Sequence, residues 1–150
     1  MRGNYDFDCN LAQTLNIVGD KWTLLVLHTI SNDKTTYKEL QETLSPIPTN
    51  TLSDRLKLLE NNGLIVSELY NEHPPRYKYV VTQKGKDFKH VFNAIILWGN
   101  KHLEGCNKTV CHESCISEVE IKYYCSKCDK YVDDLIVSEV TNNERKFRKD

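Results

Sequence analysis

Four residues in the last third of the 150-residue chain have the types and the spacing of a metal site. Two residues separate His112 from Cys115, and two residues separate Cys125 from Cys128. Imidazole nitrogen and thiolate sulfur are the ligands that Zn²⁺ prefers, and this spacing lets one tight turn supply two of them. A segment this short cannot build a core, so a tetrahedral metal ion would replace it. The sequence therefore predicts a structural zinc site.

The ligand set and the state of the thiols are open at the level of sequence. Cys111 is an alternative to His112 as the fourth ligand, and Cys106 is a weaker rival. Ile116 and Asp129 stand where zinc-binding turns usually carry a glycine. The N-terminal residues lack a secretion-signal pattern, so we expect a cytoplasmic protein, in which clustered cysteines favour metal over disulfides. Reduced thiols without metal and disulfide chemistry are the other interpretations.

A second set of polar residues lies on one face of a helix expected from Thr49 to Asn62. Helical periodicity turns Leu52, Leu56 and Leu59 toward the core. The opposite face then offers amide, hydroxyl and charged groups, which can hydrogen-bond to base edges in the major groove of DNA. The predicted DNA-contacting residues of this helix are Thr49, Asn50, Thr51, Ser53, Asp54, Arg55 and Lys57.

The members of this set differ in what they are expected to do. Groove-reading helices contact bases mainly through their N-terminal part, so Asn50, Thr51 and Asp54 are the candidates for base contacts. Arg55 flanks the core side and is alternatively expected to pair with a nearby carboxylate. A polar outer face is also ordinary for a surface helix. The DNA-binding interpretation therefore depends on the elements around this helix.

The elements before it predict a helix-turn-helix. Asp20 opens an apolar helix through KWTLLVLHTI, and a short amphipathic helix follows within TTYKELQETLS. Pro46 and Pro48 prevent that helix from continuing, so a tight turn leads directly to Thr49.

The elements after it predict a wing. Gly63 ends the helix, and the β-rich runs LIVSELY and YKYVVT are separated by NEHPPR, as in a hairpin. Arg76 and Lys78 on this hairpin are expected to bind phosphates and so to supply affinity without sequence information. The formal net charge of −1 provides no overall attraction to DNA, so local patches of this kind must supply it. Thr82 then caps a long helix expected from about Gln83 to Glu104, with an apolar stripe wider than one domain needs.

Three stretches in this order carry a family resemblance. They are CNLAQTLNIVGDKWTLLVLHTI, YKELQETLSPIPTNTLSDRLKLLENNGLI, and EHPPRYKYVVTQKG with LWG beyond it. Together they resemble the HxlR-type subgroup of MarR-like winged-helix regulators. The resemblance implies a homodimer formed by the first and the long last helices, with two recognition helices in successive major grooves. It also implies control of neighbouring operons in response to reactive carbonyls, oxidants or aromatic compounds, and it is compatible with a ribbon-like C-terminal tail.

Cys9 matches the position at which this family carries a cysteine before its first helix, and in some members that thiol senses electrophiles. A helix N-terminus stabilises a thiolate, whereas the neighbouring Asp6 and Asp8 oppose it. Cys9 is therefore a candidate redox sensor, and a buried structural cysteine is the alternative.

An enzyme is not expected. His112 with the Cys125–Cys128 pair partly matches a zinc deaminase, but Glu113 directly follows the histidine and Tyr124 precedes Cys125, unlike the H-x-E and P-C-x-x-C pattern. Neither a phosphate-binding glycine loop nor a G-x-S-x-G motif occurs.

The sequence thus predicts a mainly α (α+β) chain with two parts. Residues 1–104 form a winged helix-turn-helix DNA-binding and dimerisation domain with flanking dimerisation helices, and residues 105–150 form a small Cys-rich, zinc-binding β extension with a basic tail, NNERKFRKD. We expect a homodimeric, sequence-specific transcription regulator, a repressor, that binds a double-stranded DNA operator and responds to a small-molecule or electrophile effector, with no membrane association. The alternative is a winged-helix and zinc-ribbon interaction module of the transcription machinery.

Overall fold

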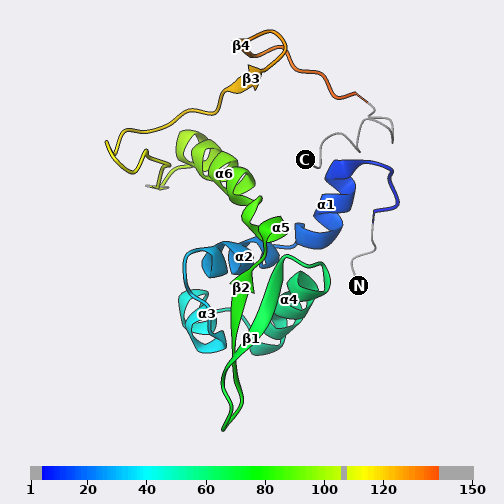
Figure 1. The fold of residues 1–150 in the computed structure, drawn as a ribbon, viewed down its shortest axis with the longest axis vertical. Helices are drawn as coiled ribbons and strands as arrows, with labels where there is room; N and C mark the ends of the chain where they lie inside the picture. The colour runs from blue at the N-terminus through cyan, green and yellow to red at the C-terminus, as the bar shows by residue number, and fades with distance from the viewer. Residues whose placement is uncertain (1–4, 106–107, 139–150) are drawn as a thin grey trace. The chain divides into compact units, whose positions relative to one another are not determined.

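The computed structural model describes residues 5–105 and 108–138. Backbone contacts divide the chain into two units, Met1–Ile96 and Leu97–Asp150, which we describe separately. The predicted boundary after residue 104 falls inside the second unit and stays a prediction. Cys106 and the basic tail lie outside the described residues. The elements are α1 (Asn10–Val18), α2 (Thr23–Ser31), α3 (Tyr37–Thr43), α4 (Thr49–Asn61), β1 (Ile65–Asn71), β2 (Arg76–Val81), α5 (Gln83–Lys86), α6 (Lys89–His102), β3 (Tyr123–Cys125) and β4 (Lys130–Val132) (Figure 1).

The core of the first unit is built around α2, which packs against α1, α3, α4 and β2. Val26 and Leu27 of α2 are completely buried, as the apolar character of this helix predicts. The predicted inward face of α4 is confirmed, because Leu52, Leu56 and Leu59 are all buried. Burying a leucine side chain contributes roughly 1.5–3 kcal/mol, so this face fixes which side of α4 remains outside.

The predicted tight turn between α3 and α4 is also confirmed. Thr36 and Glu39 form a capping box that starts α3, and the helix ends before Pro46. Between Pro46 and Pro48, the side chain of Ile47 is buried in the core, and its backbone N–H donates to the carbonyl of Leu44 at 2.9 Å. The turn is therefore anchored by an apolar side chain as well as limited by the two prolines.

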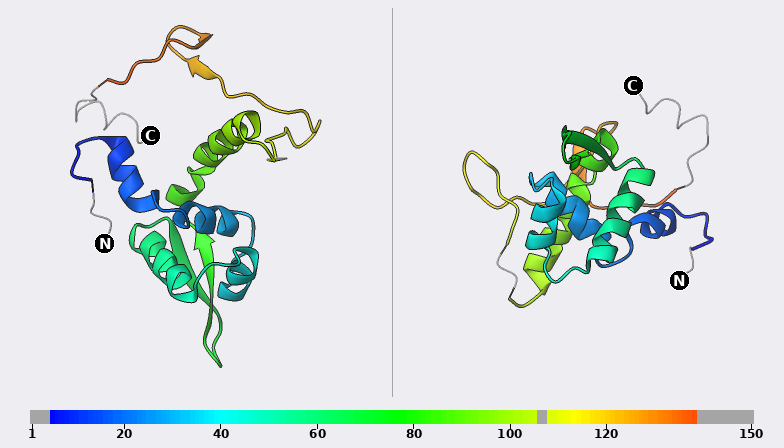
Figure 2. Two further views of the ribbon diagram at one scale, coloured as in Figure 1. Left: turned by 180° about the vertical axis from the view of Figure 1, so that it is seen from behind. Right: turned by 90° about the horizontal axis from the view of Figure 1, so that it is seen from below.

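The predicted wing is an antiparallel hairpin of β1 and β2. It projects beyond the helices of its unit in Figure 1 and in the reverse view of Figure 2. Ile65 lies opposite Val81 at its base, and the register shifts between Leu69 and Asn71 near the tip. An isolated bridge from Thr36 to Lys78 also joins the start of α3 to the wing.

Two helix boundaries differ from the prediction. The single helix expected from about Gln83 to Glu104 is two helices, α5 and α6, although its cap is confirmed because the Thr82 hydroxyl accepts from the N–H of Gly85 at 3.2 Å. The break brings Phe88 against the core and sets Phe92 on His28 of α2, with ring centroids 5.0 Å apart. The helix that Asp20 is expected to open begins three residues later, at Thr23. Asp20 lies before it and accepts the backbone N–H groups of Trp22 and Thr23.

The second unit is open in comparison. Among the described residues beyond α6, the secondary structure is the short β3–β4 hairpin and an isolated bridge between Cys111 and Glu118. Every described residue from 108 to 138 is exposed or only half-buried, including Ile116, Ile121 and Tyr131. The described parts of the chain therefore form a mainly helical winged helix-turn-helix with small β-hairpins, and none of their helices has the length and apolarity to cross a membrane.

Candidate nucleic-acid interface

The N-terminal end of α4 is held by Tyr37 of α3. Its hydroxyl donates to the backbone carbonyl of Thr49 at 2.9 Å and lies 3.3 Å from Oγ of Ser53. Ser53 is half-buried as a result, so it faces α3 more than solvent. Tyr37 was missed by the sequence prediction, because nothing local marks a side chain that acts on a helix twelve residues away.

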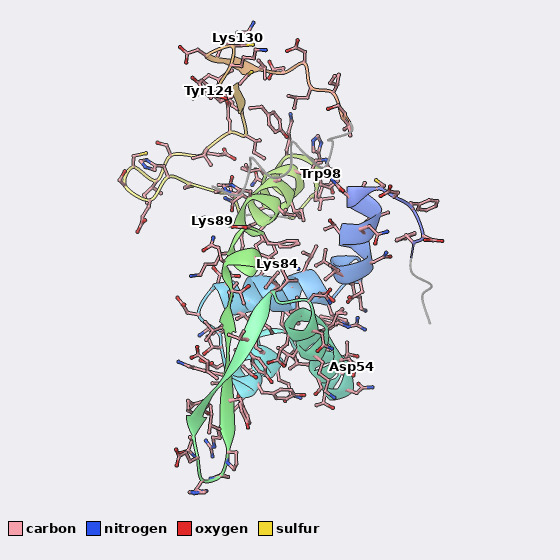
Figure 3. The ribbon with its side chains drawn as sticks, turned by 45° about the vertical axis from the view of Figure 1, so that its right-hand side comes forward. Asp54, Lys84, Lys89, Trp98, Tyr124 and Lys130 are labelled. Carbon is pink, nitrogen blue, oxygen red and sulfur yellow. The ribbon has the colours of Figure 1, made fainter. Side chains whose placement is uncertain are left out.

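The outer face of α4 carries most of the predicted base-contacting groups. Asn50, Asp54 and Lys57 are exposed, and Thr51 is half-buried. Figure 3 shows Asp54 on the outer side of the helix. Oδ1 of Asn50 accepts from the backbone N–H of Thr51 at 2.9 Å, so a bidentate pair with adenine would require this oxygen to turn away. These residues offer donors and acceptors along one face, as a groove-reading helix needs.

Arg55 is engaged within the protein. Its guanidinium lies 3.2 Å from the carboxylate of Asp20, and its Nε is buried without a hydrogen-bond partner among the described residues. This is the carboxylate pairing that the sequence left as the alternative to DNA contact. The same carboxylate accepts the backbone N–H groups of Trp22 and Thr23, and the hydroxyl of Thr23 donates to it as well. Asp20 thus ties the start of α2 to the middle of α4.

Burial of the Asp20 carboxyl works against its charge. The hydrogen bonds from the side chain of Thr23 and from the backbone of Trp22 and Thr23, together with the charge of Arg55, outweigh that penalty and lower the pKa of Asp20 below its ordinary value of 3.8. The carboxylate is ionised at neutral pH and remains a partner for Arg55.

Two side chains position the far end of α4. Lys84 of α5, labelled in Figure 3, donates from Nζ to the carbonyl of Asn62 at 2.8 Å, where a cation complements the helix C-terminus. Glu60 accepts from the backbone N–H of Ser67 in the wing at 3.0 Å. Gly63, at φ +68°, occupies the left-handed conformation that ends the helix. Both ends of α4 are thereby connected to neighbouring elements.

The two predicted phosphate-binding residues of the wing differ. Lys78 forms an ion pair with Glu68 across the hairpin at 3.1 Å, which neutralises part of its charge. Arg76 is exposed and takes part in none of the ion pairs found in the described residues. Arg76 is therefore the wing cation best placed to meet a phosphate.

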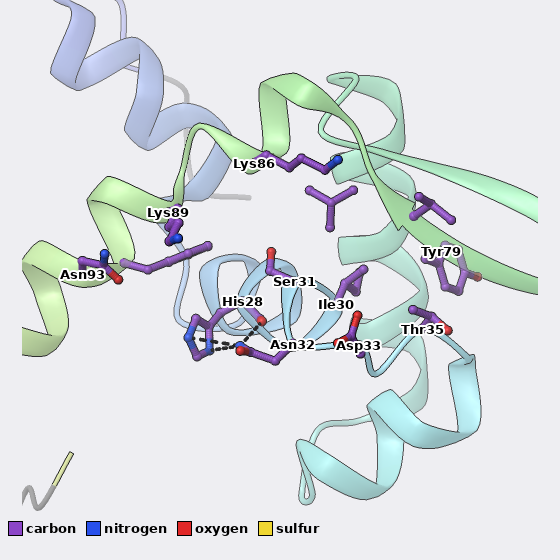
Figure 4. A pocket seen from close by; sticks show the side chains of 13 residues that line it. His28, Ile30, Ser31, Asn32, Asp33, Thr35, Tyr79, Lys86, Lys89 and Asn93 are labelled. Atoms are coloured by element: carbon purple, nitrogen blue, oxygen red, sulfur yellow. Dashed lines mark hydrogen bonds between the residues drawn. The ribbon is translucent and has the colours of Figure 1, made fainter. Parts of the chain in front are cut away.

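A pocket of about 630 Å³ lies between the C-terminal end of α2, strand β2 of the wing and the α5–α6 region (Figure 4). Tyr79, Val81 and Phe92 supply apolar walls, and Lys86 and Lys89 add cationic groups. Burial raises the pKa of the Tyr79 phenol above its ordinary value, so the phenol is neutral at physiological pH. The sequence prediction missed this pocket because its wall residues come from distant segments.

The thiols are placed as follows. Cys9 is exposed at the N-terminus of α1. Nδ1 of His112 lies 3.2 Å from Sγ of Cys115, and hydrogen bonds from the hydroxyl and N–H of Ser117 lower the pKa of the Cys115 thiol. Hydrogen bonds from the backbone and side chain of Cys128 lower the pKa of the Cys125 thiol. The structure thus forms two pairs, and no three His, Cys, Asp or Glu side chains of the described residues are grouped as a metal site.

Comparison with known proteins places this chain in a family. A helix-turn-helix regulator of transcription from Methanothermobacter thermautotrophicus is 34% identical over 100 residues, which are 67% of this chain and 76% of the relative. The redox regulator HypR in its oxidized form is 27% identical, with a TM-score of 0.55, over 68% of this chain and all of the solved chain (100%). PA1607, described as a candidate transcription factor, shares the fold over 90% of this chain and 97% of its own, with a TM-score of 0.75 and 22% identity.

The family model described as HxlR-like helix-turn-helix matches residues 17–107, which include every element of the first unit from α2 onward. Because the matched family consists of transcription regulators, the chain is not an enzyme. The chain belongs to the HxlR-like helix-turn-helix family of transcriptional regulators.

Proposed function

We propose that this regulator is a homodimeric, sequence-specific repressor that reads its operator through the exposed N-terminal half of α4 and responds to a small-molecule or electrophile signal. The observation that carries the proposal is the outer face of α4, with Asn50 and Asp54 exposed and both helix ends fixed by Tyr37 and Lys84. A rigid helix with a polar outer face next to a cationic wing fits the major groove and its flanking phosphates.

Binding to a labelled duplex from the region upstream of the gene tests this proposal. Asn50→Ala removes a base contact, so the ratio of affinities for the specific and a scrambled duplex should fall by about 5- to 150-fold, equivalent to 1–3 kcal/mol. Arg76→Ala removes a phosphate contact, so the affinities for both duplexes should fall by similar factors. The slope of the logarithm of the binding constant against the logarithm of the salt concentration should become shallower by about one. Lys122→Ala, which removes a cation paired with Glu120 in the second unit, is the control and should change neither.

The competing function is an interaction module of the transcription machinery. Such a module needs protein contacts and no operator, so it predicts that the wild-type chain binds specific and scrambled duplexes equally at low salt. That result would remove the repressor proposal.

The homodimer is supported by apolar side chains on α1 and α6. Leu11 of α1 is 67% exposed, and Val91, Ile95 and Trp98 recur on α6 at spacings of four and three residues with 43%, 50% and 59% exposure. Apolar surface of this extent usually marks an interface. Ile95→Asp should therefore shift the sedimenting mass from twice the 17.5 kDa chain toward one chain. Asn100→Asp is the control, and a dimer unaffected by Ile95→Asp would exclude this face.

The small-molecule branch of the signal is supported by the pocket. Apolar walls with two lysines suit a small aromatic anion, and the pocket borders β2, so its occupant would act on the wing. Benzoate is a simple probe. It should raise the melting temperature of the wild-type protein and have less effect on Lys89→Ala, whereas Lys101→Ala should respond like the wild type. Equal responses of all three proteins would exclude the pocket.

The redox branch is supported by the exposure of Cys9 and by the likeness to the redox regulator HypR. An exposed thiol is open to attack by electrophiles in solution. We expect iodoacetamide to modify Cys9 in the folded protein, and Cys9→Ser to abolish the release of DNA by an electrophile. Release of DNA from Cys9→Ser at the wild-type rate would leave the small-molecule branch alone.

A further inference from the structure

Two turns in the second unit share one backbone design. In the first, the N–H of His112 donates to the carbonyl of Ser117 at 2.9 Å. In the second, Cys125 pairs with Lys130 across the β3–β4 hairpin, which Tyr124 and Lys130 mark in Figure 3. In each turn the backbone closes from one residue to the residue five positions later. His112 in the first turn therefore corresponds to Cys125 in the second.

The correspondence continues through each turn. Cys115 and Cys128 both stand three positions after the opening residue, and the next residues, Ile116 and Asp129, have φ values of 55° and 52°. Positive φ is rare outside glycine and is unfavourable for a β-branched residue such as isoleucine. The left-handed residue that zinc-binding turns place after their second ligand is thus present in both turns, even though neither residue is glycine.

We propose that His112, Cys115, Cys125 and Cys128 bind one Zn²⁺ ion, with each turn supplying two of the four ligands. Tetrahedral Zn–N and Zn–S bonds place their donor atoms about 3.6 Å apart, and Nδ1 of His112 already lies 3.2 Å from Sγ of Cys115. On binding, the three thiols release their protons to solvent and the imidazole coordinates in its neutral form, so the site carries one negative charge.

The shared register also selects the fourth ligand. Cys111 pairs with Glu118, one position outside the five-residue closure, and three residues separate it from Cys115 instead of two. The second turn has no ligand at the equivalent outer position, because Tyr124 stands there. His112 therefore fits the repeated design and Cys111 does not.

The state of the surrounding segment gives the metal a structural role. None of the described residues from 108 to 138 is buried, and Ile116 and Tyr131 are 72% and 69% exposed. No apolar core holds the two turns together, so the metal would be the group that joins them, with its binding coupled to folding of this segment.

Metal analysis of the full chain, purified under reducing conditions, tests the proposal without using DNA, so its outcome is independent of the repressor proposal. We expect one zinc per chain, bound more tightly than about 1 µM, and an intense tetrahedral cobalt spectrum after exchange. Cys125→Ser and Cys128→Ser should each lose the metal, His112→Ala should weaken it by at least tenfold, and His112→Cys should restore it. Cys111→Ser is the matched control and should bind zinc like the wild type.

Limited proteolysis supplies a second readout, and the helical circular dichroism of the first unit shows that each variant is folded. Zinc should protect residues 108–138 from cleavage, and chelator should remove that protection. A folded wild-type chain that binds neither zinc nor cobalt would overturn the proposal. Loss of metal in Cys111→Ser with retention in His112→Ala would overturn the ligand assignment.

Discussion

The contact between Asp20 and Arg55 makes a quantitative prediction about how α4 is held on α2. Asp20 satisfies two backbone N–H groups at the start of α2 and pairs with Arg55 at 3.2 Å. Loss of a capping side chain costs about 1 kcal/mol. Loss of the partner of a half-buried cation, whose Nε already lacks a hydrogen bond, costs about 1–2 kcal/mol more. Asp20→Ala should therefore lower the free energy of unfolding by about 2–3 kcal/mol.

Asp20→Asn separates the two contributions. Asparagine caps a helix about as well as aspartate does, so this variant should lose only the charge pairing, about 1–2 kcal/mol. Urea unfolding followed by circular dichroism measures both, and a urea dependence of about 1–3 kcal/mol per molar makes the two midpoints distinguishable. In a double-mutant cycle with Arg55→Ala, the coupling with Asp20→Asn should be about 1 kcal/mol.

The pH dependence provides a further check. The folded-state pKa of Asp20 is lowered, so its stabilisation is fully present above the ordinary value of 3.8 and is lost as the pH falls through the lower folded value. The stability difference between the wild type and Asp20→Asn should therefore shrink in acid. Equal stability of the wild type and Asp20→Ala at neutral pH, or a coupling of zero with Arg55→Ala, would refute this account of how α4 is held.

Three further predictions concern the elements that present α4. Tyr37→Phe removes the hydrogen bond to Thr49 and should cost about 1 kcal/mol in urea unfolding, with weaker operator binding in a gel-shift assay; unchanged values for both would show that Tyr37 does not position α4. Gly85→Ala would place a Cβ against the backbone carbonyl oxygen of Leu64, so overpacking of about 1–3 kcal/mol should exceed the gain in helix propensity. The control Gly99→Ala, with its nearest neighbour at 3.7 Å, should stabilise the protein by up to about 1 kcal/mol. Thermal unfolding measures both variants, and equal effects on stability would contradict the clash. Leu52→Ala should lower the free energy of unfolding by about 2–5 kcal/mol, because Leu52 is fully buried. Thermal unfolding measures this loss, and a loss of stability below about 1 kcal/mol would mean that α4 does not pack as described.

The parts of the fold that the sequence predicts well are those specified locally. The apolar periodicity of α4, the prolines at 46 and 48 and the β-rich runs on either side of NEHPPR act over a few residues, and the structure has these elements where they were expected. Thr36 and Glu39 also have the spacing of a capping box, a local signal that the prediction did not use.

The parts that the sequence does not predict depend on distant partners. The break between α5 and α6 has no proline to mark it, because its cause is the packing of Phe88 and Phe92 on the core and on His28. Side chains of the candidate nucleic-acid interface are also predictable only where local sequence determines their position. The outward position of Asn50 follows from the helix period, whereas the engagement of Arg55 by Asp20 and of Lys78 by Glu68 depends on tertiary contacts.

Ile47, buried between two prolines in the turn before α4, has a consequence for the kinetics of DNA recognition. With the turn fixed in the core, the reading helix is already ordered in the free protein, and little conformational entropy remains to be lost on contact with DNA. Association should then be limited by electrostatic encounter, with a rate that falls as salt rises. Differences in affinity between operators should accordingly appear mainly in the dissociation rates of the complexes.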